Sequence, residues 1–489
     1  MKPPSALRAL LAIAAVRLLL HTLTNGQYGF HRDELATLDD ARHLDWGYVA
    51  YPPFTPFVAR LALELLGSAP AAVRFFTALA QCAAMVVAGL MARELGRRAQ
   101  IITALAVAVS PVSMSAGHLF QYVSFDFLWS VVTIYFVIRL LNSDNPRWWI
   151  AIGAAIGLGL MTRYTIAWLV AGLAVGFLLT PARKLLLSRW LIAGAAVTLV
   201  IILPNLIWQA SHSFISLDFL RSIHARDIRI GRTDGFLWKQ LLVPANLFTI
   251  PLWIAGLFFY FRKPEGRRYR ALGWTFAAAL ALFTVTRARD YYTAPLYPML
   301  LAAGAVSSMK WPRWGRGLNW VGLAVALGLG IAFALPVAPI NSRWFEASIK
   351  VNNDLREEIG WQELVDTVAK IRDSLPVEER AASGILTGNY GEAGAIDLYG
   401  PAHGLRPALS RVNSFWLRGF GDVPPQTLIV VGLSPDFVNA NFASCESKGT
   451  ISNRFGVPNE ETEYHKYLWV CRGVREPWPE FWRKIKLWA

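Results

Sequence analysis

Two adjacent acids, Asp33 and Glu34, are the first residues in the chain whose types and spacing suggest chemistry. They stand in a long polar segment, residues 25–70, between two apolar stretches. Neighbouring side chains on a helix diverge by about 100°, so the two carboxyls could not share one proton unless the backbone bends. We expect one acid to face inward as a general base and the other to fix its orientation. The alternative is a pair of acids that only favours the positive end of a helix.

A third acid, Asp126, lies in the apolar sequence Phe125-Asp126-Phe127-Leu128-Trp129. An ionisable side chain at membrane depth is costly and usually has a function. The alternative is an acid at a helix end that still lies in the hydrated headgroup layer. We favour a functional role for Asp126.

Arginines form the second group of candidates. Arg287 and Arg289 stand just before Asp290-Tyr291-Tyr292, and Arg163 interrupts another apolar stretch. The guanidinium fork matches the oxygens of a phosphate, so these arginines could hold one. Snorkelling arginines beside interfacial tyrosines are the alternative. The segment 209–240, rich in Arg and His, is either a basic surface for an acceptor or a lipid, or a solvated loop. No Cys and His cluster has the spacing of a zinc site.

The composition shows what kind of scaffold must position these residues. Of 489 residues, 54% are hydrophobic and only 17% are charged, against about 25% charged in a soluble protein. The chain is therefore expected to lie largely in lipid. The formal net charge is +15. A nucleic-acid partner would need that charge gathered on a soluble face, whereas charge in short loops sets topology and attracts membrane lipids.

Apolar runs long enough to approach the roughly 20 residues of a membrane span recur along the first two thirds of the chain. We predict about eleven spans, near 7–24, 71–92, 99–116, 124–141, 148–162, 164–180, 190–208, 241–261, 271–286, 293–309 and 318–337. The stretch 148–180 could instead be one long helix with a re-entrant piece, which would change the parity.

Positive charge sets the orientation of these spans. Short connections on one side carry Lys2, Arg8, Arg93, Arg97, Arg98, Arg147, Arg183, Lys184, Arg189, Arg262, Lys263, Arg267, Arg268, Arg270, Lys310, Arg313 and Arg316. By the positive-inside rule this side is cytoplasmic, and the N-terminus lies there. We interpret the first apolar run as a retained anchor and not a cleaved signal peptide. An odd number of spans then places residues 338–489 outside the cytoplasm.

Residues 338–489 have the sequence pattern of a small α/β domain. Short apolar runs at 385–388, 428–432 and 467–471 are typical of strands, and helical patterns lie between them. Cys445 and Cys471 are both in this region, where oxidising conditions would permit a disulfide. The sequence alone leaves that pairing open.

The candidate residues occur in motifs that resemble the bacterial members of the protein O-mannosyltransferase family, glycosyltransferase family 39, which are related to the aminoarabinose and galacturonic-acid transferases of lipopolysaccharide. The order and spacing of the motifs over nearly the whole chain carry the resemblance. They are Phe30-His31-Arg32-Asp33-Glu34, Leu44-Asp45-Trp46-Gly47-Tyr48-Val49, Tyr51-Pro52-Pro53, Phe125-Asp126, Met161-Thr162-Arg163-Tyr164-Thr165, Asp290-Tyr291-Tyr292, Pro295-Leu296-Tyr297-Pro298, Gly388-Asn389-Tyr390-Gly391-Glu392-Ala393 and Cys471-Arg472-Gly473.

The resemblance implies a GT-C fold, in which an all-α polytopic membrane domain has a cavity on its outer side. That domain would be residues 1–337, with its first outer loop at 25–70, and a periplasmic α/β domain would follow at 338–489. The donor would be a sugar on a polyprenyl phosphate.

The resemblance also assigns roles to the candidate residues. Asp33 would be the base, beside Glu34, and Asp126 would be the second acid. Arg287 or Arg289, near the tenth span, would hold the donor phosphate. Two further residues are candidates for contact with the donor phosphate. They are Tyr292, which follows these arginines in the Asp290-Tyr291-Tyr292 motif, and Arg163, an arginine within another apolar stretch.

The implied function is an inverting glycosyltransferase of the bacterial inner membrane. Its acceptor would be lipid A, other lipopolysaccharide, another envelope glycan or a protein, and a divalent cation could assist the departing phosphate. Where the aminoarabinose enzymes have Glu-Lys before the proline, this chain has Ala50-Tyr51 before Pro52, which argues against aminoarabinose transfer. The alternative from another class is a transporter or flippase for an anionic lipid or solute.

Overall fold

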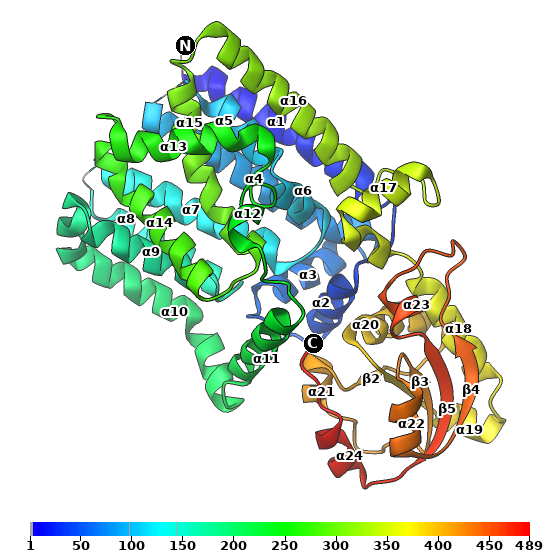
Figure 1. Ribbon diagram of the computed structural model, residues 1–489. Coiled ribbons are helices and arrows are strands. Elements are labelled where there is room, and N and C mark those ends of the chain that lie inside the picture. Colours follow the sequence, from blue (N-terminus) through cyan, green and yellow to red (C-terminus); the bar gives the residue numbers. More distant parts are fainter. Residues whose placement is uncertain (1–2, 97, 144) are drawn as a thin grey trace.

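The computed structural model describes residues 3–96, 98–143 and 145–489. Lys2 and Arg97, two of the charges used for the orientation, lie outside these ranges. Helices α1 to α16 form a bundle, and a region with a β-sheet lies against one end of it (Figure 1). Helix α1 begins at the end of the bundle away from the sheet, whereas the C-terminus lies close to α2 and α11.

Five helices in the described residues are long and apolar enough to cross a membrane. They are α1 (Pro3–Thr24), α4 (Pro70–Gly96), α7 (Tyr122–Ser143), α10 (Arg189–Ser211) and α16 (Arg313–Ala334). Two bent pairs raise this number to seven if each pair is one span. These are α5 (Gln100–Ala108) with α6 (Pro111–His118), bent by 65°, and α9 (Ile166–Leu178) with η1 (Pro181–Leu187), bent by 114°.

The remaining predicted spans are helical but short. The α-helices are α8 (Trp148–Leu160), α13 (Ile250–Arg262), α14 (Arg270–Val285) and α15 (Tyr297–Ser308). Short 3-10 helices flank some of them, namely η2 (Leu247–Thr249), η3 (Arg267–Tyr269) and η4 (Asp290–Leu296). The stretch 148–180 consists of two separate helices, not one long one. Because α13 has 13 residues and α15 only 12, against about 20 for a full crossing, the number eleven stays a prediction.

The break between α5 and α6 has a local cause. Pro111 begins α6, and a residue before proline avoids the helical region; Ser110 accordingly has φ −63° and ψ 132°. The predicted span 99–116 is therefore kinked in its middle.

Burial divides the bundle into inner and outer helices. In their apolar windows, α4 and α7 are 61% buried, whereas α1, α10 and α16 are only 17% buried. Leu199, Val200 and Val321 are among the large apolar side chains left exposed on the outer helices. Surfaces this apolar are stable in lipid and not in water, so these helices face the membrane.

The loop between α1 and α4 is folded into two helices, α2 (Arg32–Arg42) and α3 (Phe54–Leu65). Helix α2 starts with a capping box, in which the His31 side chain accepts from the Asp33 backbone and Glu34 accepts from the His31 backbone. Further along the chain, α11 (Ile215–Arg229) and α12 (Phe236–Lys239) follow α10. In Figure 1, α11 lies between the end of α10 and the C-terminus.

The C-terminal region contains a mixed five-stranded sheet in the order β2-β1-β3-β5-β4. The strands are β1 (Gly384–Thr387), β2 (Leu409–Ser410), β3 (Thr427–Val431), β4 (Phe442–Thr450) and β5 (Tyr467–Val474). The helices are α17 (Arg343–Val351), α18 (Trp361–Asp373), α19 (Val377–Ala382), α20 (Tyr390–Tyr399), α21 (Asn413–Arg418), α22 (Pro435–Asn441), α23 (Glu460–Glu463) and α24 (Trp478–Lys484), with η5 (Asn353–Glu358) and η6 (Gly400–His403).

The predicted strands are found as β1, β3 and β5. Strand β1 is parallel to β2 and β3, while β5 is antiparallel to β3 and β4. The sequence did not predict β4, because this edge strand is mostly exposed and polar. A disulfide joins Cys445 of β4 to Cys471 of β5, the residues that face each other in the register.

The two regions share a hydrophobic core. Leu35 and Leu38 of α2 belong to the same buried cluster as Val365 of α18 and Ile396 of α20. A second cluster, with Leu428 and Phe442, lies wholly within the C-terminal region. The division at 337/338 stays a prediction, because one of these cores crosses it.

Candidate active site

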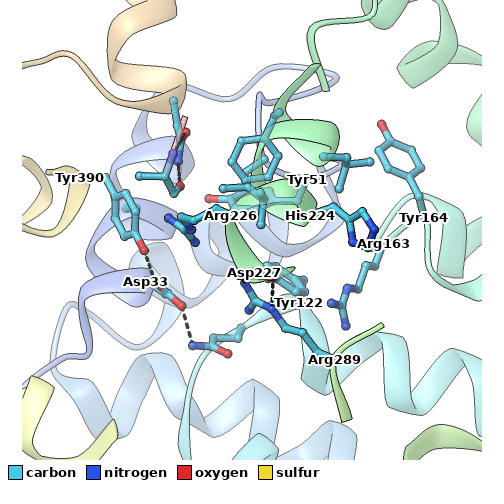
Figure 2. A pocket seen from close by; sticks show the side chains of 18 of the residues that line it. Asp33, Tyr51, Tyr122, Arg163, Tyr164, His224, Arg226, Asp227, Arg289 and Tyr390 are labelled. Carbon is cyan, nitrogen blue, oxygen red and sulfur yellow. Dashed lines mark hydrogen bonds and ion pairs between the residues drawn. The ribbon is translucent and has the colours of Figure 1, made fainter. Parts of the chain in front are cut away.

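A cavity of about 840 Å³ lies where α2, α11 and α20 meet the end of the bundle. Its wall includes Asp33, Arg163, Arg287, Arg289 and Tyr292, five of the seven residues predicted from the sequence. Glu34 and Asp126 do not line it. Figure 2 shows Asp33 on one side of the cavity and Arg163 on the other.

Asp33 faces the cavity from the first turn of α2, with 40% of its side chain exposed. Tyr390 Oη donates to Asp33 Oδ1 at 2.7 Å, and Gln121 Nε2 donates to Oδ2 at 3.1 Å. Burial by itself would raise the pKa of Asp33, but His31, Arg32 and the bond from Tyr390 outweigh it and lower this pKa below its usual value. The group is therefore an ionised carboxylate at neutral pH, as a general base requires.

Glu34 points into protein instead of the cavity. Arg74 donates to both of its carboxylate oxygens, at 2.8 and 2.5 Å. The backbone amides of Phe120 and His31 each add a bond of 2.7 Å. With its oxygens fully engaged and its side chain enclosed, Glu34 has no direct contact with the cavity. This placement fits the orienting role expected for one acid of the pair, and a catalytic role for Glu34 stays an untested prediction.

Two further residues extend this buried ionic network to the C-terminal region. Glu358 lies 3.3 Å from Arg74 and shares a hydrogen bond of 2.7 Å with His118 Nε2. Burial, with Glu34 nearby, raises the pKa of Glu358 to about 8. Glu358 was not predicted, because it is one of several acids between residues 345 and 375 and no motif distinguishes it.

Asp126 stands behind the wall and not in it. Its Oδ2 lies 3.8 Å from Arg163 and accepts from Thr165 Oγ1 at 3.3 Å, while its Oδ1 has no hydrogen-bond partner among the described residues. The contact it makes with the cavity is therefore indirect, through the guanidinium of Arg163.

Arg163 is held by aromatic rings. Its guanidinium lies 4.2 Å from the ring centre of Tyr292, 4.8 Å from that of Tyr122 and 5.6 Å from that of Tyr291. Cation–π contacts of this kind fix the position of the charge. They occupy the face of the guanidinium, so its N–H edge, with Asp126 3.8 Å away, can bind an anion in the cavity.

The other two predicted arginines are more strongly paired. Asp227 of α11 accepts from Arg289 at 2.6 and 2.9 Å in a bidentate pair (Figure 2). Arg287 is mostly exposed and lies 3.4 Å from Asp234. Of the three arginines, Arg163 keeps the least compensated charge.

Other residues of the site were not predicted. Gln121 and Tyr390 hold Asp33, and Asp227 lines the cavity from α11. Arg226, also on α11, belongs to the basic segment 209–240, which the sequence left open as a surface for an acceptor or a lipid or as a solvated loop. Tyr390 had a signal, since it lies in one of the motifs that carry the family resemblance. Asp227 had none, because it is a single acid in an arginine-rich segment.

Metal ligands do not gather in the part of the chain that the structure describes. No group of three or more His, Cys, Asp or Glu side chains is placed to hold an ion. We assign no step to a divalent cation.

Comparisons with known proteins agree with this arrangement. The family profile described as dolichyl-phosphate-mannose-protein mannosyltransferase matches residues 50–208. The crystal structure of apo ArnT from Cupriavidus metallidurans superimposes with a TM-score of 0.63 at 17% identity, covering 95% of this chain and 98% of that one. The chain has the GT-C fold. The resemblance predicted from the sequence is thereby confirmed.

Two further relatives are informative. ArnT from the same organism bound to undecaprenyl phosphate gives a TM-score of 0.59 at 17% identity, covering 94% of this chain and 97% of that one. The lipid A galacturonosyltransferase RgtD of Rhizobium johnstonii is 28% identical over 363 residues, which are 70% of this chain and 72% of RgtD.

Proposed function

We propose that the protein is an integral-membrane, inverting glycosyltransferase that moves a sugar from a polyprenyl-phosphate donor to an envelope acceptor. The observation that carries this proposal is that two charged residues line opposite sides of one cavity. They are Asp33, an ionised carboxylate, and Arg163, whose guanidinium is held by tyrosine rings. A base and a cation on opposite walls suit the displacement of a phosphate by a hydroxyl.

The reaction uses these groups in one step. The acceptor hydroxyl attacks the anomeric carbon as its proton passes to Asp33. The bond between that carbon and the phosphate oxygen breaks, and polyprenyl phosphate leaves with one additional negative charge. Arg163, positioned by Asp126 and the tyrosine rings, stabilises that charge. Attack from the face opposite the phosphate inverts the anomeric carbon.

The relatives support the lipid-linked donor and suggest a finer choice of substrate. ArnT has been crystallised with undecaprenyl phosphate, and RgtD is by name a lipid A galacturonosyltransferase. An acidic sugar and lipid A are therefore the first pair to test. The absence of Glu-Lys before Pro52 in the sequence argues against aminoarabinose.

The proposed orientation follows from the charges. With the N-terminus in the cytoplasm of a bacterial cell, the cavity and the C-terminal region lie on the periplasmic side of the inner membrane. Lipid-linked sugars and lipid A are then within reach of the same cavity.

Replacement of the base tests the proposal. Asp33→Asn keeps the size of the side chain and removes its basicity, so transfer from a labelled polyprenyl-phosphate sugar should fall by about 10²–10⁴-fold. The exposed acid Glu64 of α3 provides the matched control, because Glu64→Gln should keep full transfer. Undiminished transfer by a folded Asp33→Asn protein would remove Asp33 as the base.

A further inference from the structure

The cavity has a second cation that the displacement reaction does not use. Arg226 reaches the cavity from α11. Figure 2 shows it beside Asp33 and Tyr390, on the side away from Arg163. Its position therefore differs from that expected for a ligand of the leaving phosphate.

The charge balance of the wall leaves Arg226 uncompensated. Seven arginines line the cavity against four acids. The arginines are Arg32, Arg163, Arg221, Arg226, Arg232, Arg287 and Arg289, and the acids are Asp33, Asp40, Asp227 and Glu460.

Most of these arginines have an acidic partner. Arg32 pairs with Glu460, Arg289 with Asp227, Arg287 with Asp234 and Arg221 with Asp218. Arg232 lies 3.8 Å from Asp227.

Arg226 forms no ion pair with any residue that the structure describes. Its Nε is buried and has no hydrogen-bond acceptor within the described ranges. Burial and then the neighbouring Arg232 lower the pKa of Arg226, which is the direction expected for a cation without a close partner. An enclosed donor left without an acceptor costs free energy, and a ligand oxygen would remove that cost.

The stereochemistry of an inverting reaction determines which part of the substrates lies near Arg226. In an inverting displacement the base and the leaving group lie on opposite faces of the anomeric carbon. Arg226 is on the side of Asp33, whose Oδ1 accepts from Tyr390. It therefore faces the transferred sugar or the acceptor, and not the donor phosphate.

We propose that Arg226 forms a second anion subsite, which binds an oxyanion carried by the transferred sugar or by the acceptor. The chemical class is a carboxylate, as on a uronic acid, or a phosphate, as on a phosphorylated glycolipid. The inference rests on the proposed function and adds to it the determinant for an acidic substrate. Arginine suits this role because its planar fork binds either group through two parallel hydrogen bonds.

Kinetics with paired substrates test the subsite. Purified protein would be assayed with polyprenyl phosphate carrying galacturonic acid or galactose, and with lipid A that retains or lacks its phosphates. The variants are Arg226→Gln, which removes the charge, and Arg226→Lys, which keeps it without the fork. Arg229→Gln is the matched control, because Arg229 is exposed on the same helix and does not line the cavity.

Arg226→Gln should lower kcat/KM about 10- to 100-fold for the substrate that carries the critical anion, as expected for a lost bond to a charged group. It should change kcat/KM little for the matched neutral substrate. Loss confined to the uronic donor assigns the anion to the sugar, and loss confined to the phosphorylated acceptor assigns it to the acceptor. Equal loss on all substrates, or no loss, would overturn the proposal.

A binding measurement separates this inference from the proposed function. Free galacturonate and phosphorylated lipid A would be tested for thermal stabilisation of the wild-type protein, Arg226→Gln and Arg229→Gln. If one of these ligands stabilises the wild type and Arg229→Gln but not Arg226→Gln, the subsite is supported, even when no sugar transfer is detected. The missing transfer would then count only against the proposed glycosyltransferase activity. Identical responses of the wild type and Arg226→Gln would count against the subsite.

Discussion

At the scale of single residues, the carboxylate of Asp33 is defined by partners that are distant in the sequence. Its two hydrogen-bond donors, Gln121 and Tyr390, are 88 and 357 positions away. The sequence could indicate Asp33 through the acid pair, but the residues that keep it ionised come together only in the folded chain.

Removal of the Tyr390 hydroxyl should change the pH dependence of transfer. The bond from Tyr390 stabilises the charged form of Asp33 and so contributes to its lowered pKa. In Tyr390→Phe this pKa rises, and more of the base is protonated at low pH. The acidic limb of the kcat/KM profile should therefore move to higher pH, with about tenfold lower kcat/KM on that limb. Tyr399→Phe, on the same helix but outside the cavity wall, should leave the limb in place; an unshifted limb in Tyr390→Phe would contradict the prediction.

Arg163 should govern the affinity for the donor. Arg163→Ala removes the guanidinium that the tyrosine rings hold, and it should raise the KM for the polyprenyl-phosphate sugar by about 10- to 100-fold. Arg163→Lys should recover only part of this loss, because an ammonium lacks the planar fork. Steady-state kinetics over a range of donor concentrations measure both effects. A KM unchanged in Arg163→Ala would move the phosphate site elsewhere in the cavity.

At the scale of elements, the start of α2 is fixed by a buried ion pair. Glu34 and Arg74 are both fully enclosed. Removal of one partner of a buried pair leaves an uncompensated charge and costs about 3–5 kcal/mol. Glu34→Ala should therefore destabilise the protein by that amount in a denaturation assay in detergent. Asp33→Asn, four-tenths exposed in the cavity, should lose transfer with little loss of stability. Equal stability of Glu34→Ala and the wild type would refute the anchoring role.

The contact of α2 with α20 should weaken in alkaline solution. Burial, with Asp39 nearby, raises the pKa of Asp397 of α20 to about 8. A carboxyl whose pKa is raised by folding stabilises the fold while it is protonated, and that contribution is lost as the pH rises through about 8. Melting temperatures from pH 6 to pH 9 should therefore fall more steeply in the wild type than in Asp397→Asn. Parallel curves for the two proteins would show that Asp397 does not control the contact.

Some elements were predictable because a local pattern specifies them. The buried strand predicted at 428–432 is found as β3. Helix α11 was not predicted, because the segment 209–240 was interpreted only as a basic surface or a solvated loop. The pairing of Glu358 with Arg74 was also beyond the sequence, because it depends on tertiary contact between residues 284 positions apart.

At the scale of the whole molecule, the cavity requires both regions of the chain. Asp33 and Arg163 come from the first 337 residues, whereas Tyr390 and Asn413 of its wall come from the rest. The shared core of α2, α18 and α20 holds the two parts together. Composition and charge could predict a membrane bundle followed by an α/β region, but not that the second region would complete the wall of the cavity.

The orientation in the membrane is the prediction on which the whole arrangement depends. Leu187 of η1 lies among the cations Arg183, Lys184 and Arg189, so it should be cytoplasmic. Val423 lies in the C-terminal region and should be periplasmic; both side chains are exposed. Single cysteines at these positions, in a Cys82→Ala background that keeps the disulfide between Cys445 and Cys471, report the side directly.

A membrane-impermeant maleimide should label Val423→Cys in cells with a permeabilised outer membrane and an intact inner membrane. It should label Leu187→Cys only after the inner membrane is opened. The physical reason is that moving the cluster of positive charges across the membrane is unfavourable during insertion, so the dense side stays inside. Labelling of Leu187→Cys from outside would reverse the orientation, place Asp33 and Arg163 at the cytoplasmic face, and remove the periplasmic lipid acceptor from reach of the cavity.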